Sequence, residues 1–276
     1  MCATDAVATH YGSGTLLDRI AAGVERLGLP RHGLDPSALS GVGEFHIGGA
    51  AATERLFDQL DVPSGARVLD VGCGIGGTAR HVAARTGARV TGIDLTGEFV
   101  ATGKVLTDWC GMADRVTLIE GSALSMPFGT GDFDLAYMLH VGMNIADKTR
   151  LMAEVARVLK PGAVFAIYDV MRVAPGEIAY PVPWAAQPGI SALASPHAYL
   201  DALTAAGFAL VAQTDRTEFA LDFFATLAAR AAAADGPPPL GLHLVMGPSA
   251  PDMVANMARN IRAGLIAPVE MIVRRR

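Results

Sequence analysis

The chain has few cysteines, few charged residues and no long apolar run, and each shortage excludes a class of protein. Its 276 residues include only Cys2, Cys73 and Cys110, an odd number of isolated thiols. That spacing fits neither a disulfide framework nor a zinc site, so we expect no bound metal. No stretch reaches the ~18 uninterrupted apolar residues of a membrane-spanning helix. The first residues also lack the basic-then-apolar layout of a secretion signal, which favours a cytoplasmic protein that does not bind membranes.

Charge is also scarce, and positive charge is not in excess. Charged residues make up 18% of the chain and the formal net charge is −5. Without a basic patch, nucleic acid is not an expected partner. Hydrophobic residues make up 51%, and a chain of this length can bury a large core as one decorated domain. The chain could act as a homodimer.

A glycine-rich turn between residues 72 and 77 is the most informative feature that is present. It follows an apolar strand at residues 67–71, and Asp70 lies just before its first glycine. A helix is expected directly after it, at residues 78–85. In an open α/β sheet such a turn lies at the carboxyl end of a strand, where ligands bind. Glycines let the backbone approach a ligand, and a helix N-terminus offers free N–H groups to an anion.

The glycines alone fit two nucleotide cofactors. Gly72, Gly74 and Gly77 satisfy the dinucleotide pattern G-x-G-x-x-G, with Asp94 at a suitable distance for a ribose. Two features favour S-adenosylmethionine instead. The Asp70 carboxylate would repel a pyrophosphate but suits the ammonium group of a methionine. The strand also comes late in the chain, after a helical N-terminal part, whereas dinucleotide-binding folds usually begin with it.

Strands and helices alternate along the first two thirds of the chain, which predicts a parallel, doubly wound sheet. The expected strands lie at residues 67–71, 89–93, 116–120, 133–139 and 164–168, and the expected helices at 14–27, 50–60, 97–110 and 146–159. The last third departs from this alternation. It predicts a loop at 171–195, a helix at 197–206, a strand at 209–213, an aromatic helix at 219–227, a helix at 251–264 and a last strand at 269–273.

Four motifs, at residues 68–74, 91–95, 121–128 and 157–162, together resemble the class I S-adenosylmethionine-dependent methyltransferases. The resemblance is to the small-molecule branch, which includes glycine/sarcosine N-methyltransferases and sugar or tocopherol methyltransferases, and it covers roughly residues 40–215. It implies an α/β fold: a Rossmann-like, seven-stranded, doubly wound sheet with N-terminal helices. We expect an N-terminal helical cap at 1–62 and a methyltransferase core at 63–276. Lid segments are expected at 171–195 and at 219–265, the latter a helical insertion between strands six and seven.

The resemblance also implies contacts with the cofactor. Gly72, Cys73 and Gly74 are expected against its methionine part, and Asp94 on both ribose hydroxyls, which two carboxylate oxygens can accept. Leu95, Ser122 and Ala123 are expected at the adenine. Many relatives have an acid in place of Ser122, and a serine oxygen can still accept a hydrogen bond from the adenine amine.

Residues 44–49 precede the helix before the first strand. In the resembling enzymes an N-terminal segment folds over the cofactor, so this stretch is expected to close the site. The alternative is a plain loop with a buried histidine.

Methyl transfer from a sulfonium needs an aligned nucleophile, exclusion of water and, where the nucleophile carries a proton, a base. His140 is the leading candidate base, because it ends the strand at 133–139 and a histidine titrates near neutral pH. The alternative is that His140 contacts the cofactor only through its backbone. Asp169, at the end of the strand at 164–168, is the second catalytic candidate, or it merely begins the loop. Asn144 is a weaker polar candidate for binding the acceptor.

The acceptor pocket is expected under aromatic side chains. Tyr180 and Trp184 could form its roof, and Phe223 could line it, although aromatic stripes also occur in cores. Such a site suits a partly apolar acceptor, or a cation held by an aromatic face. The leading hypothesis is methyl transfer to an N, O or C nucleophile of a small molecule. Because a fold does not fix a reaction, a cyclase or isomerase that retains the cofactor without consuming it is the alternative. Two further hypotheses are an accessory subunit that binds S-adenosylmethionine without catalysing a reaction, and a dehydrogenase.

Overall fold

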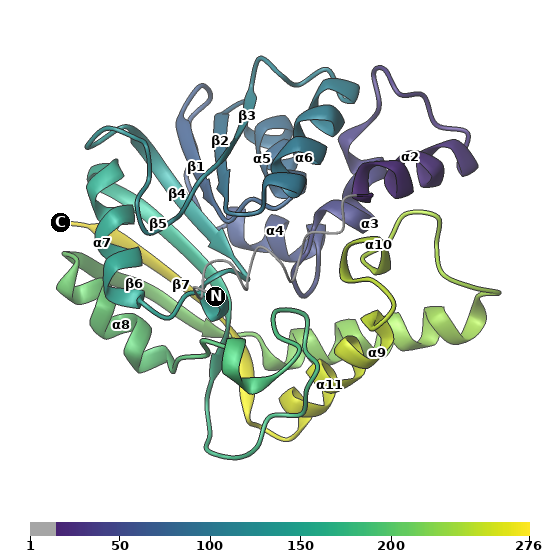
Figure 1. Cartoon of the computed structure of the whole chain (residues 1–276). Helices are drawn as coiled ribbons and strands as arrows, with labels where there is room; N and C mark the ends of the chain where they lie inside the picture. Colours follow the sequence, from purple (N-terminus) through teal and green to yellow (C-terminus); the bar gives the residue numbers. More distant parts are fainter. Residues whose placement is uncertain (1–14) are drawn as a thin grey trace.

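We use a computed structural model of the protein and describe residues 15–276 of it. The predicted start of the first helix at residue 14, and the first part of the predicted cap at 1–62, lie outside the described residues. The centre of the molecule is one seven-stranded sheet in the order β3-β2-β1-β4-β5-β7-β6 (Figure 1). Its strands are β1 (Arg67–Val71), β2 (Arg89–Asp94), β3 (Val116–Glu120), β4 (Phe133–Leu139), β5 (Leu159–Arg172), β6 (Phe208–Asp215) and β7 (Ile266–Arg275).

The first five strands are parallel, as the alternating pattern predicts, whereas β7 runs antiparallel to both of its neighbours. In that register Asp215, the last residue of β6, pairs with Val269 near the start of β7. The chain therefore leaves β6 and enters β7 at the same edge of the sheet. All the residues inserted between these strands begin and end at the carboxyl edge, where an open α/β sheet binds its ligands.

Helices cover both faces of the sheet, so the doubly wound prediction is confirmed. Neighbouring residues of β4 enter different clusters: Met138 packs with Leu151 and Tyr199, whereas Tyr137 packs with Val82. The first face is covered by α7 (Lys148–Val158) and α8 (Pro196–Ala205), and the second by α4 (Ala50–Phe57), α5 (Gly77–Thr86) and α6 (Gly97–Trp109). This alternation is what a strand buried on both sides requires.

The N-terminal helices pack beside α6. They comprise α2 (Leu16–Arg26), η1 (Pro36–Leu39) and α3 (Ser40–Gly43). Ile20 and Val24 are buried in one cluster with Phe99 and Leu240, so α2 buries an apolar face there. Leu27 follows the last residue of the helix and is 46% exposed. That residues 1–62 form a cap stays a prediction.

The insertion between β6 and β7 holds three helices, of which the short α10 was not predicted. They are α9 (Thr217–Ala233), α10 (His243–Met246) and α11 (Ala250–Arg262). Met257 and Ile261 of α11 pack with Phe224 of α9 and with Trp184, forming a third apolar cluster. Helices α9 and α11 lie side by side (Figure 1). Between residues 15 and 276, none of the helices combines the length and the apolar character needed to cross a bilayer.

Candidate active site

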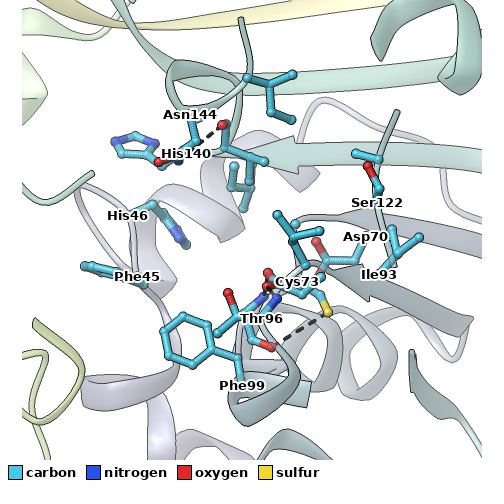
Figure 2. A pocket seen from close by; sticks show the side chains of 18 of the residues that line it. Phe45, His46, Asp70, Cys73, Ile93, Thr96, Phe99, Ser122, His140 and Asn144 are labelled. Atoms are coloured by element: carbon cyan, nitrogen blue, oxygen red, sulfur yellow. Dashed lines mark hydrogen bonds between the residues drawn. The ribbon is translucent and has the colours of Figure 1, made fainter. Parts of the chain in front are cut away.

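A cavity of about 470 Å³ opens at the carboxyl ends of β1, β2 and β4 (Figure 2). This volume is in the range of small-molecule and cofactor sites. Segments from much of the chain line it: residues 42–46 without Glu44, 70–75 without Val71, 93–96, 121–124 and 139–141, and farther on 144–147, 189–192 and Val245. Asp70, Gly72, Cys73, Gly74, Asp94, Leu95, Ser122, Ala123, His140 and Asn144, all predicted from the sequence, lie together on its wall.

The glycines of the turn are required by its geometry. Gly72 has φ +78°, and a Cβ there would lie 2.3 Å from a methyl group of Val141. Gly74 has φ +52°, and nothing lies within 4 Å of the place of its Cβ. The first glycine thus permits close packing against the loop after β4. The second provides a left-handed backbone conformation and leaves open space on the cavity side.

Asp94 ties the turn to the end of β2. Its carboxylate accepts hydrogen bonds from the backbone N–H of Gly74 and of Thr96, both at 2.8 Å. Burial raises the pKa of Asp94, and these two backbone hydrogen bonds oppose that shift. Each oxygen accepts one bond from the protein and has a second lone pair that a hydroxyl group could use.

Asp70 is buried at the same edge but lacks this support. Its Oδ2 atom has no hydrogen-bond partner within residues 15–276. Burial raises the pKa of the carboxyl group to about 8, and the neighbouring Tyr137 hydroxyl opposes that shift. A buried polar atom without a partner is costly, and at a cavity wall a ligand can satisfy it. A ligand with a cationic donor, such as an ammonium group, fits this position.

The charged side chains of the described cavity wall are acidic. Asp70, Asp94 and Asp147 line it, whereas its described wall contains no lysine or arginine. Residues 1–14 also contain neither of these two residue types. The donor set therefore fits S-adenosylmethionine, which carries an ammonium and a sulfonium, and it disfavours the pyrophosphate of a dinucleotide.

The predicted adenine neighbours line the cavity, but their individual contacts stay predictions. The hydroxyl oxygen of Ser122 accepts a hydrogen bond from the N–H of Leu124 at 3.2 Å.

Burial raises the pKa of Cys73 well above the usual thiol value. Since a thiol nucleophile must ionise, this shift favours the interpretation of Cys73 as a small residue of the turn.

His140 has both ring nitrogens engaged by backbone groups. Nδ1 lies 3.2 Å from the carbonyl oxygen of Tyr168, and Nε2 lies 3.3 Å from the N–H of Ile47. Because a carbonyl only accepts, Nδ1 carries the proton and Nε2 accepts the hydrogen bond from Ile47. Burial lowers the pKa of His140 to about 3. Among the described residues it is also the one non-glycine with a positive φ, 55°, a conformation often found at functional sites.

Asp169 does not line the cavity. It is fully buried behind η2 (Gly142–Asn144), where its Oδ2 accepts a hydrogen bond from the hydroxyl of Tyr199 at 2.6 Å. A Cβ on Gly142 would lie 2.4 Å from the same oxygen. Burial raises the pKa of Asp169 to about 6. The side chain therefore supports the turn that carries Asn144, and contact with an acceptor stays a prediction.

The predicted aromatic roof is not part of the cavity wall either. Trp184 belongs to the apolar cluster around α11, and Tyr180 and Phe223 pack against it. The residues at 189–192 line the cavity instead. Trp184 stands one layer behind them, because its Nε1 donates a hydrogen bond to Ser191 Oγ at 2.9 Å. Contact of these three aromatic side chains with an acceptor stays a prediction.

Several wall residues were not assigned individually from the sequence. Phe45 and His46 belong to the segment expected to close the site, and the structure brings both to the cavity. Thr96 and Phe99 follow the acid at the end of β2, a position that could have indicated them. Ile190 lies in a long proline-rich loop that gave no comparable signal.

Comparisons with known proteins find similarity to methyltransferases. A family model described as a methyltransferase domain matches residues 69–167. The methyltransferase GfsG of Streptomyces halstedii is 34% identical over 137 residues, which make up 50% of this chain and 48% of that protein. The chain thus spans about half the length of this relative.

Solved structures share the fold at lower identity. Geranyl diphosphate C-methyltransferase from Streptomyces coelicolor A3(2), solved with Mg²⁺, geranyl-S-thiolodiphosphate and S-adenosyl-L-homocysteine, is 19% identical with a TM-score of 0.71, covering 100% of this chain and 99% of that one. The [4+2]-cyclase SpnF is 23% identical with a TM-score of 0.69, covering 100% and 97%. At these identities the likeness supports the fold alone. The family match shows that residues 69–167, which include the glycine turn, match a methyltransferase domain.

Proposed function

We propose that this protein binds S-adenosylmethionine and transfers its methyl group to an N, O or C nucleophile of a small organic molecule. The observation that carries the proposal is the unpartnered Asp70 carboxylate oxygen beside a glycine turn that Asp94 holds in place. Asp70 would hold the methionine ammonium, and Asp94 the ribose hydroxyls. The backbone of residues 72–74 would receive the methionine part, with Leu95, Ser122 and Ala123 at the adenine.

The bound cofactor supplies a methyl carbon on a sulfonium, whose methyl–sulfur bond breaks with its electron pair staying on sulfur. The chain's residues must then align the acceptor and exclude water. Residues 42–46, 189–192 and Val245 enclose the cavity from three separate segments. His140 as the base requires its Nε2 to release the N–H of Ile47 first, and this role stays a prediction.

The wall also supports a type of acceptor. Leu139, Val141, Ile145 and Ile190 give it an apolar surface, and the acidic groups repel anions. A partly apolar or cationic acceptor fits this surface best. That the protein acts in the cytoplasm, or as a homodimer, stays a prediction.

The test is turnover of the purified full chain with S-adenosylmethionine and a panel of partly apolar alcohols, phenols, amines and active methylene compounds. We expect S-adenosylhomocysteine and a methylated product in equal amounts by mass spectrometry. Asp94→Ala, made in parallel, should lose this activity at low cofactor concentration. A protein that binds the cofactor but forms no S-adenosylhomocysteine with any acceptor would contradict the proposal.

Cofactor-retaining cyclisation is the second candidate, because the likeness to the [4+2]-cyclase SpnF extends over the whole chain. The same assay separates the two functions. Methyl transfer consumes the cofactor, whereas a cyclase converts its substrate to an isomer of equal mass and leaves the cofactor unchanged.

A further inference from the structure

A second histidine lies in the cavity, and no chemistry has been assigned to it. His46 follows α3 and is only 6% exposed, yet it lines the cavity wall. Its ring centroid lies 6.0 Å from that of His140 and 6.2 Å from that of Tyr168. Figure 2 shows both histidines on the same side of the cavity. His46 can therefore reach the same bound molecule as His140.

The hydrogen bonds of His46 fix its tautomer. Nε2 lies 3.0 Å from the carbonyl oxygen of Gly49 and 3.1 Å from the hydroxyl oxygen of Thr53. Because a carbonyl oxygen only accepts, Nε2 carries the proton in the neutral ring, and the lone pair is on Nδ1. Nδ1 makes no hydrogen bond with any residue of the described chain. A base needs such a free lone pair at the site.

A buried carboxylate supports the ring from behind. Glu44 Oε2 accepts hydrogen bonds from the hydroxyls of Thr53, at 3.0 Å, and of Thr78, at 2.8 Å. The same oxygen lies 3.7 Å from His46 Nε2. Thr53 thus bridges the carboxylate and the imidazole. This arrangement orients the ring and stabilises an imidazolium, as the acid of a catalytic triad does for its histidine.

His140, unlike His46, lacks the free ring-nitrogen lone pair that a base needs. Both of its ring nitrogens are engaged, and the one lone pair holds the N–H of Ile47. That hydrogen bond anchors the segment on which His46 lies. No acidic side chain forms an ion pair with His140 among the described residues. The geometry therefore suits His140 for holding the segment and His46 for accepting a proton.

We infer that His46 takes the proton of the acceptor during methyl transfer, with Glu44 and Thr53 as its positioning residues. The inference rests on the proposed function. The acceptor's X–H bond gives its proton to Nδ1 of His46, and its electron pair forms the bond to the methyl carbon. The methyl–sulfur electron pair stays on sulfur. The proton passes to water after the methylated product leaves. An acceptor with a hydroxyl or ammonium group is the class that needs this step.

The titratable groups around His46 set the expected pH dependence. Burial lowers the pKa of His46, the Glu44 charge opposes this shift, and His81 adds to it. His81 lies 3.8 Å from the other oxygen of Glu44, and the rings of His140 and Tyr168 lie next to the ring of His46. His46 is therefore neutral at neutral pH. Removing the Glu44 charge should shift the acidic limb of the pH–kcat profile to lower pH.

The kinetic test compares His46→Gln with His140→Gln, at saturating S-adenosylmethionine and with an acceptor from the panel. We expect His46→Gln to lower kcat by roughly 10²-fold or more, the scale of a lost general base, with the Kd for the cofactor within about threefold. His140→Gln should lower kcat by less than about tenfold, because glutamine can still accept from Ile47. Glu44→Gln should shift the acidic limb as stated. Equal activity of His46→Gln and wild type would overturn the inference while leaving methyl transfer intact.

A second measurement needs no acceptor. Nitrogen NMR of the full chain with ¹⁵N-labelled histidine, loaded with S-adenosylhomocysteine, reports which ring nitrogen carries the proton. The spectrum of His46→Gln assigns the signal. We expect a neutral ring protonated at Nε2 at pH 7. A ring protonated at Nδ1 would overturn the inference, because no lone pair would then face the acceptor. If the wild type binds the cofactor but never forms S-adenosylhomocysteine, the proposed function fails instead.

Discussion

At the scale of single residues, two carboxylates at the same edge of the sheet differ in their hydrogen bonds. Asp94 accepts two backbone hydrogen bonds, whereas the Oδ2 atom of Asp70 accepts none from the described residues. Asp94 therefore shapes the turn as well as facing the cavity. Asp70 is a buried group whose partner is expected to be the ligand.

Asp94→Ala should raise the Kd for S-adenosylmethionine at least tenfold. A bidentate ribose contact contributes about 1.5–3 kcal/mol, and the Gly74 N–H also loses its acceptor. Isothermal titration calorimetry measures the change. Glu120→Ala, at the end of the neighbouring strand and outside the cavity wall, is the matched control and should leave the Kd unchanged. Equal affinity of Asp94→Ala and wild type would refute the ribose assignment.

Binding of the cofactor should release protons near neutral pH. In the protein without cofactor, the pKa of Asp70 is about 8, so its carboxyl group is largely protonated at pH 7. The group must ionise to pair with an ammonium. The Kd should therefore fall as the pH rises from 6 to 8. Titrations in two buffers with different ionisation enthalpies count the protons, and Asp70→Asn is the control that should release none from this site. Wild-type binding with no proton release would contradict the pairing.

The same carboxyl group should lower the stability of the free protein at high pH. Its folded-state pKa lies above the ordinary aspartate value of 3.8, so the folded state binds more protons than the unfolded state between pH 4 and pH 8. The unfolding free energy then declines across this window as the pH rises. Thermal melts of Asp70→Asn should show a gain in Tm over wild type that widens from pH 5 to pH 8. A constant difference across this range would be inconsistent with the burial of this group.

At the scale of elements, the site depends on backbone contact between the N-terminal segment and α5. A Cβ on Gly77 would lie only 2.1 Å from the carbonyl oxygen of Gly43. Thr78, the next residue, donates its hydroxyl to Glu44. The residues that carry Phe45 and His46 thus rest directly on the helix that follows the glycine turn.

Gly77→Ala should displace this segment and weaken cofactor binding. The added methyl group overlaps backbone, which cannot move aside as a flexible side chain could. We expect a lower Tm and a Kd for S-adenosylmethionine at least several-fold higher. Gly189→Ala is the matched control, because nothing lies within 4 Å of its added Cβ, and its Tm should stay near that of wild type. A Tm for Gly77→Ala equal to that of the control would argue against the docking.

The sequence predicted the elements and contacts that depend on local signals. The strand at 67–71 has the predicted bounds, since an apolar run meets a glycine turn there. The place of residues 189–192 in the cavity wall could not be predicted, because hydrogen bonds to residues distant in the sequence hold them there. Lys148 Nζ donates to the carbonyl of Ala192 at 2.8 Å, and the N–H of Ala192 donates to the carbonyl of Met143 at the same distance. Trp184, predicted as part of a roof, lies behind this wall, where its Nε1 donates a hydrogen bond to Ser191 Oγ.

At the scale of the whole molecule, the topology brings distant parts of the chain to one cavity. Val42 and Val245 line the same wall although most of the sheet lies between them in sequence. The antiparallel β7 returns the inserted helices to the carboxyl edge, so that α10 reaches the site. The acidic side chains of the wall and the glycine turn then face one ligand, which we propose to be S-adenosylmethionine.

Isothermal titration of the purified full chain with S-adenosylmethionine, and separately with NADH, tests the identity of this ligand. We expect micromolar binding of S-adenosylmethionine and no binding of NADH, because the carboxylates at Asp70 and Asp94 favour a cation over a pyrophosphate. Binding of NADH, or of neither molecule, would contradict this expectation, and the roles of Asp70, Asp94 and His46 would be withdrawn together.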